Sequence, residues 1–164
     1  MTAAEIHAKL APLLGEAIGP LSEPKVDAFA VVKGDRLLEA ARHLKATPGL
    51  DLDHCNDLTA LDWPARNVIE VVYHLFSYRH RHGIVLKVEA SRANPVVPSV
   101  ESVWKAANWL EREIYDLLGV NFTGHSDLRR LLLPEDWVGY PLRKDFVEPD
   151  EYHGISTRRE SLLR

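Results

Sequence analysis

Four side chains in the C-terminal half of the chain have the types that bind a metal ion: the carboxylates of Glu111, Glu113 and Asp116 and the imidazole of His125. A helix followed by a turn can bring such ligands together, which would suit a metal-dependent hydrolase. The spacing argues against convergence of these side chains on one metal ion, because Arg112 lies between the glutamates and the acids are spread around the helix. The sequence favours ion pairs with arginines, within the chain or across an interface, and leaves the hydrolase using Glu111, Glu113 and His125 as an alternative.

Two other combinations of reactive side chains have ordinary explanations. Cys55 follows His54, and a histidine partner lowers the pKa of a thiol. Adjacent residues on a strand point to opposite faces, so the sequence predicts a buried structural cysteine. His74, His80 and His82 share one parity along a strand and its turn, but two of them lie beside arginines in the turn, where exposed histidines are common. There is no glycine-rich phosphate loop either, so the sequence favours a binding or scaffold role.

The elements that must position these residues are those of an α+β fold, a two-layer domain over residues 1–120 in which helices pack on a mixed β-sheet. Apolar residues at helical or alternating spacing define them, and apolar residues on both faces of 68–78 predict a central strand. In order, the sequence predicts a helix over 3–18 with a kink or break near Pro12, a strand over 26–32, a helix over 34–46, an ambiguous segment over 51–64, strands over 68–78 and 84–91, and a helix that Ser99 or Ser102 caps.

The last of these helices is expected to end at Leu118, with Gly119 as its left-handed cap. Glu113 falls at the edge of its apolar stripe. Arg112 and Asp116 lie four positions apart on the far side, where they would form an ion pair. The stripe that would pack on the sheet consists of Val103, Ala107, Leu110, Ile114 and Leu117.

Residues 121–164, named here the C-terminal arm, show no sustained helical or alternating pattern, and we expect them to be extended. Neighbouring arginines in an extended chain face opposite ways, so Arg129 would bind a partner while Arg130 pairs back on Glu111 or Glu113. Arginines and large apolar side chains together are typical of interface cores. In the arm these are Arg129, Arg130, Leu131, Leu132, Leu133, Trp137, Tyr140, Arg143, Lys144 and Phe146.

An alternative for the arm is that it folds back over its own sheet. Its last part, residues 150–164, is charged and poor in apolar residues, so we expect it to become ordered on a partner or to stay mobile.

Composition narrows the class of protein. A chain of 164 residues that is 46% hydrophobic can form one core, and a net charge of -4 argues against a nucleic-acid-binding surface. The single cysteine excludes an intrachain disulfide, and it excludes an iron–sulfur cluster held by this chain alone, since such clusters need about four thiolates. No run of residues is long and apolar enough for a membrane span, and the first residues do not resemble a leader peptide. We therefore expect a cytoplasmic, soluble chain that carries no electrons itself.

A larger pattern includes these residues. Glu111, Arg112 and Glu113 are followed by Asp116, Leu117 and Leu118, then by His125, by Arg129 and by Leu131 and Leu132. This pattern resembles the signature of the 30-kilodalton subunit, also called the C subunit, of respiratory complex I, the NADH:quinone oxidoreductase. The resemblance continues through residues 57–64, 71–88, 94–109 and 131–146, whereas the first 50 residues match only in the order of their elements.

The resemblance implies a non-catalytic subunit of the peripheral arm of a proton-pumping NADH:quinone oxidoreductase, on the cytoplasmic side of a bacterial membrane. It implies packing against the large subunit that resembles nickel–iron hydrogenases and helps to form the quinone site, and contact with other hydrophilic-arm subunits. FMN, iron–sulfur clusters and quinone would be bound elsewhere in the complex. The alternatives are the equivalent subunit of a membrane-bound hydrogenase or of a ferredoxin-dependent complex.

The resemblance also names the residues expected to carry the motif or to form the subunit interface. They are Glu111, Arg112, Glu113, Asp116, Gly119, Phe122, Gly124, His125, Asp127, Leu128, Arg129, Arg130, Pro134, Trp137, Gly139, Pro141, Leu142, Arg143, Lys144, Asp145 and Phe146.

Overall fold

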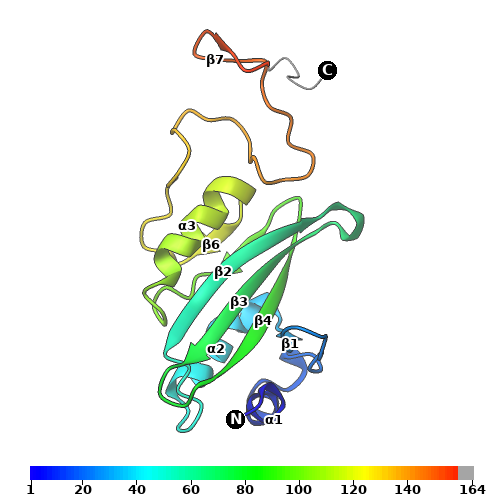
Figure 1. Ribbon diagram of the computed structural model, residues 1–164, viewed down its shortest axis with the longest axis vertical. Coiled ribbons are helices and arrows are strands. Elements are labelled where there is room, and N and C mark those ends of the chain that lie inside the picture. Colours follow the sequence, from blue (N-terminus) through cyan, green and yellow to red (C-terminus); the bar gives the residue numbers. More distant parts are fainter. Residues whose placement is uncertain (159–164) are drawn as a thin grey trace.

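A mixed four-stranded sheet forms the centre of the computed structural model, which describes residues 1–158 (Figure 1). The strand order is β1-β4-β3-β2. Strand β1 (Phe29–Val31) lies parallel to β4 (His82–Ser91), and the pairs β4–β3 and β3–β2 are antiparallel. Strand β3 (Val68–Ser77) is an inner strand, as its apolar residues on both faces predicted, and β2 (His54–Trp63) lies at the edge. The α+β class with a mixed sheet is therefore confirmed.

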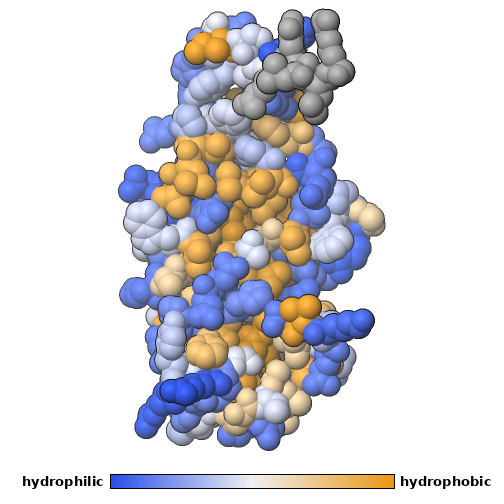
Figure 2. Space-filling model, viewed as in Figure 1, coloured by the Kyte–Doolittle hydropathy of each residue, from blue (hydrophilic) through white to orange (hydrophobic). Residues whose placement is uncertain are grey.

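Three helices cover one face of this sheet. Helix α2 (Leu37–Ala46) lies behind the strands in the view of Figure 1, α1 (Ala3–Leu14) lies next to their lower end, and α3 (Ala107–Leu118) packs beside β2. Alternate strand residues supply the core beneath them, among them Ile69, Tyr73 and Leu86. The other face of the sheet carries no helix among residues 1–158, and Figure 2 shows hydrophobic side chains along the middle of this view.

The N-terminal elements differ in extent from the prediction. Helix α1 starts with a capping box between Thr2 and Glu5 and runs without a break through Pro12. Pro12 removes the amide that would donate to the carbonyl of Ala8, but only two helical residues follow it, so little of the helix depends on that bond. A 3-10 turn, Gly15–Ala17, follows. The predicted strand over 26–32 shortens to β1, and the ambiguous segment over 51–64 is the full edge strand β2.

The prediction that Ser99 or Ser102 caps the third helix is wrong, because α3 begins only at Ala107. Residues before it form β5 (Val96–Pro98), which pairs in parallel with β6 (Asn121–Thr123). The hydroxyl of Ser99 donates to the carboxylate of Glu111 instead of capping a helix. Gly119, at φ 74°, is the left-handed cap that the sequence predicted.

Beyond β6 the described part of the arm, up to residue 158, holds only the short hairpin of β7 (Glu151–Tyr152) and β8 (Ile155–Ser156). Figure 1 shows it running past α3 and away from the sheet, with the hairpin at the far end of the molecule from α1. The expectation for residues 150–164 falls partly on the last six residues, which lie outside the described part.

Candidate functional site

Asp116, in the last turn of α3, fixes the path of the arm. Its side chain is fully buried, and its Oδ2 accepts hydrogen bonds from the consecutive backbone amides of Leu131, Leu132 and Leu133 at 3.0, 2.7 and 2.9 Å. Its Oδ1 accepts from Arg130 Nη1 at 2.8 Å. Burial alone would raise the pKa of Asp116, but these donors outweigh burial and hold the pKa below its usual value. The carboxylate is therefore ionised and binds the arm mainly through its main chain.

Arg112 holds the same stretch from the other side. The guanidinium is buried, donates from Nε to the carbonyl of Arg129 and from Nη2 to that of Arg130, both at 3.2 Å, and lies over the ring of Trp109. The predicted ion pair between Arg112 and Asp116 is therefore wrong. An irregular segment needs partners for its buried backbone groups, and both side chains serve that need instead.

Arg130 pairs with the last turn of the helix and not with the glutamates. It donates to the side chain of Asp116 and, at 2.9 Å, to the carbonyl of Trp137. The prediction that it pairs with Glu111 or Glu113 is wrong, because Glu111 points into the domain and Glu113 is exposed to solvent. Thus three charged side chains, from α3 and from the arm itself, secure the arm.

Glu111 is a fully buried acid in the core between α3, the sheet and the segment before α3. Its oxygens accept from the hydroxyl of Ser99 at 2.5 Å and from the amide of Val100 at 2.7 Å. Burial raises its pKa to about 7, against the lowering effect of these donors. Burial, and then the charge of Glu111, also raises the pKa of Tyr73, whose hydroxyl has no hydrogen-bond partner among the described residues.

His125 closes the other side of this buried group. Its Nδ1 accepts from the amide of Asp127, so Nε2 carries the proton and donates to the carbonyl of Asn108 at 3.0 Å. Nε2 also lies 3.6 Å from an oxygen of Glu101 and 4.0 Å from one of Glu111. Both ring nitrogens are engaged by the backbone, which is the arrangement of a structural histidine.

The four side chains with metal-binding chemistry do not meet at one point. Asp116 faces the arm, Glu111 the core and Glu113 the solvent, while His125 is held by the backbone. Within residues 1–158 no three histidine, cysteine, aspartate or glutamate side chains are placed to hold a metal ion. Glu101 lies beside His125 and accepts hydrogen bonds from Ser126 and Asn108. No pattern in the sequence had singled out this residue.

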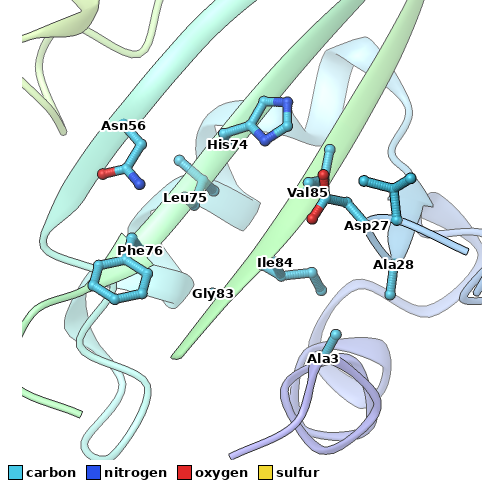
Figure 3. Close-up of a pocket in the computed structure, with 11 residues that line it drawn as sticks. Ala3, Asp27, Ala28, Asn56, His74, Leu75, Phe76, Gly83, Ile84 and Val85 are labelled. Atoms are coloured by element: carbon cyan, nitrogen blue, oxygen red, sulfur yellow. The ribbon is translucent and has the colours of Figure 1, made fainter. Parts of the chain in front are cut away.

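The other reactive side chains are structural too. Cys55 is buried as predicted, and burial raises the pKa of its thiol to about 12, far from the range of a nucleophile. His82 was expected to be exposed but is buried, since its Nε2 donates to the carbonyl of Leu50 at 2.8 Å. A hollow of about 360 Å³ lies on the open side of the sheet, with His74 and Asn56 among its polar side chains (Figure 3). No hydrogen bond links those two side chains in the described structure.

A second set of contacts ties the middle of the arm to the sheet. Arg92, after β4, binds Asp62 of β2 at 2.6 Å and Asp145 of the arm at 2.5 Å. The amide of Lys144 donates to Asp62, and Arg143 donates to the carbonyl of Leu118 at the end of α3, both at 2.8 Å. Sequence reasoning missed Arg92 and Asp62, which lie outside the motif and far from the arm along the chain.

Aromatic rings of the arm pack on glycines. A Cβ on Gly119 would lie 2.5 Å from the ring of Tyr140, and one on Gly139 would lie 2.9 Å from that of Phe146. The guanidinium of Arg143 stacks on Tyr140 at 4.9 Å. These glycines are needed both for their positive φ and for the space that the rings fill.

The outer side of the arm exposes apolar side chains. We name this set the apolar surface of the arm; its members Leu132, Val138, Leu142, Val147 and Ile155 are between 56% and 84% exposed. Arg129 points outward as well, and within residues 1–158 its side chain pairs only with Asp127, two residues away. Apolar side chains gathered on a segment that the domain holds in place are typical of a surface that binds another protein.

The remaining motif residues form turns or join the domain. Phe122 is buried in β6, and Leu128 packs against the core. Gly124 has φ 81°, the carbonyl of Pro134 accepts from the amide of Trp137, and the amide of Leu142, which follows Pro141, donates to the carbonyl of Leu117.

The match to a family model decides the relationship. Residues 30–152 match the model described as "Respiratory-chain NADH dehydrogenase, 30 Kd subunit". The chain belongs to this 30-kilodalton subunit family. It is 44% identical over 141 residues to the C subunit of the NADH-quinone oxidoreductase of Roseiflexus castenholzii, covering 85% of this chain and 81% of the relative. The same subunit of Moorella thermoacetica is 49% identical over 116 residues, 71% of this chain and 77% of the relative.

Solved structures of the family and of a related complex share the fold. A trypsin-resistant fragment of Nqo5 superposes with a TM-score of 0.65 at 26% identity, over 78% of this chain and the whole fragment. A chain of the membrane-bound sulfane sulfur reductase, an archaeal respiratory membrane complex, gives 0.72 at 25% identity, over 88% of this chain and 85% of that one. The partners of a 30-kilodalton family member are thus other subunits of a respiratory complex. In the described residues no helix has the length and apolar character to cross a bilayer.

Proposed function

We propose that this chain is a structural subunit of the peripheral arm of a proton-pumping NADH:quinone oxidoreductase, without a catalytic centre of its own. Its partner is the hydrogenase-like large subunit that helps to form the quinone site, on the cytoplasmic side of a bacterial membrane. FMN, iron–sulfur clusters and quinone belong to other subunits. The names of the relatives support the complex, and the single cysteine of the chain agrees with the absence of a cluster of its own.

The observation that carries the proposal is the construction of the arm. Its main chain is held inward by Asp116 and Arg112, while the apolar surface of the arm faces outward. A segment that served only its own domain would turn its apolar side chains inward, because burial stabilises by about 25 cal/mol per Å². The arm therefore uses charged contacts for its backbone and keeps its apolar side chains available for another subunit.

Two exposed valines give a matched test. Val138 lies on the arm and is 82% exposed, and Val26 lies in the segment before β1 and is 86% exposed. With tagged chain in cells, Val138→Asp combined with Leu132→Asp is expected to lose the co-purifying large subunit, whereas Val26→Asp retains it. Equal urea midpoints of the isolated variants would show that folding is unchanged. Retention of the large subunit by the arm variant would contradict the proposal.

The identity of the bound chains separates this proposal from the alternative complexes. The structural likeness to a chain of an archaeal sulfane sulfur reductase complex favours a related complex with another electron donor or acceptor as the second candidate. A flavoprotein that oxidises NADH among the co-purifying chains supports the first candidate, and hydrogenase or ferredoxin-linked subunits support the second. The isolated chain should show no turnover with NADH and a quinone, and turnover would overturn a non-catalytic role.

A further inference from the structure

The free edge of β2 is the feature that the arm does not explain. Strand β2 pairs with β3 on one side only, so half of its backbone amides and carbonyls point away from the sheet. Within residues 1–158 no backbone group of another segment pairs with that outer side. Edge strands are usually blunted by lysine, proline or bulges. Here a bulge lies between Cys55 and Asp57, and residues 57–63 beyond it contain neither lysine nor proline.

A narrow groove runs beside this edge. One wall is the strand from Asp57 to Ala60, and the other is one side of α3. Its lining from α3 is mainly apolar, because Ile114, Leu117 and Leu118 recur at helical spacing, and Leu142 of the arm adds to this lining. A strand added to β2 could turn alternate side chains into this groove, which is how edge strands bind extended peptides.

The rim of the groove indicates the charge of its occupant. Asp57 lies on the strand side and Glu113 on the helix side, and both are exposed. Neither carboxylate makes an ion pair with any side chain in the part of the chain that the structure describes. The field between them favours lysine or arginine on the bound segment.

Leu142 belongs both to the groove and to the apolar surface of the arm, so the groove continues the surface that the proposed function assigns to other subunits. We propose that the outer edge of β2 binds an extended segment of another subunit of the same complex as a fifth strand of the sheet. The segment has apolar residues toward α3 and basic residues at Asp57 and Glu113. This inference rests on the proposed function for the origin of the segment.

Hydrogen exchange of the assembled complex and of the free subunit tests the added strand. On assembly, the amides of residues 57–63 that face away from β3 should exchange at least about tenfold more slowly, because strand addition bonds the backbone itself. Unchanged exchange there, with the arm protected, would overturn the inference and leave the proposed function standing. Failure of the subunit to join any complex would count against both.

Charge reversal and cross-linking identify the occupant. Asp57→Lys with Glu113→Lys should weaken assembly about tenfold, whereas Glu23→Lys, an exposed acid away from the groove, should not. A photo-cross-linking amino acid placed at the exposed position of Thr59 should link to a basic and apolar segment of another subunit. A link to a second copy of this chain, or to its own residues 159–164, would refute the inference even if the charge variants fail to fold.

Discussion

Replacing Glu111 with glutamine should remove a pH dependence of folding stability. The pKa of the buried Glu111 is about 7, and the ordinary value is 4.5. Between these two values the folded chain keeps the proton and the unfolded chain loses it, so the free energy of unfolding falls as the pH rises, by up to about 1.4 kcal/mol per pH unit. The loss begins near pH 4.5, is complete above pH 7 and amounts to about 3 kcal/mol. Because the side chain is fully buried, solvent does not screen this effect.

The assay is urea unfolding of the wild-type chain and of Glu111→Gln at several pH values from about 5 to about 8. The glutamine has the shape of the protonated acid, and its carbonyl can accept from the amide of Val100 as Glu111 Oε1 does. Subtracting the two curves cancels all groups that titrate alike in both proteins. Glu113→Gln, on the exposed side of the same helix, is the matched control and should keep the wild-type slope.

Equal pH slopes for the wild type and Glu111→Gln would refute the reasoning, because they would mean that Glu111 is ionised in the fold throughout this range. A control that lost the pH slope as fully as Glu111→Gln would refute it as well, because the slope would then not belong to Glu111.

Two further changes concern the arm and its cap. Asp116→Asn should weaken the three amide contacts and the pair with Arg130, at a cost of about 2–3 kcal/mol in the free energy of unfolding. Trypsin should then cut after Arg129 or Arg130 at least about tenfold faster while the sheet stays folded. An unchanged cutting rate would contradict this. Gly119→Ala should lower the free energy of unfolding by more than about 1 kcal/mol, because φ is positive and the added Cβ meets Tyr140. Urea unfolding should show that Tyr140→Ala, combined with Gly119→Ala, relieves part of this cost. Strictly additive effects of the two substitutions would argue against the clash.

Local patterns predicted most of the fold. Apolar residues on both faces of β3, most of the stripe of α3 and the glycine at its end each follow from neighbours a few residues away, although the structure buries Leu118 and not the predicted Leu117. The predicted start of α3 was wrong, because Ser99 can cap a helix or bind a buried acid and nothing local decides between the two. The length of β1 depends on its pairing with β4, which lies far along the chain.

The motif in the sequence singled out the residues of the candidate site, but it did not predict which of them pair with one another. A helical wheel places Arg112 and Asp116 opposite the sheet, a position that looks exposed until another segment covers it. The arm covers it and buries both side chains. Partners of this kind depend on where an irregular segment lies, and no periodicity encodes that. The ion pairs of Arg92 with Asp62 and with Asp145 were not predicted for the same reason, since the arm meets these residues only in the folded chain.

The contact between Asp116 and the arm leaves the side chains of the arm free to vary. The carboxylate binds the amides of residues 131–133 and none of their side chains. Any residue except proline offers the same amide, so the side chains at these three positions can be exchanged without moving the chain that carries them. Natural variation or design can therefore replace the exposed side chains at these positions so that the arm binds a different subunit, while its backbone keeps the same path.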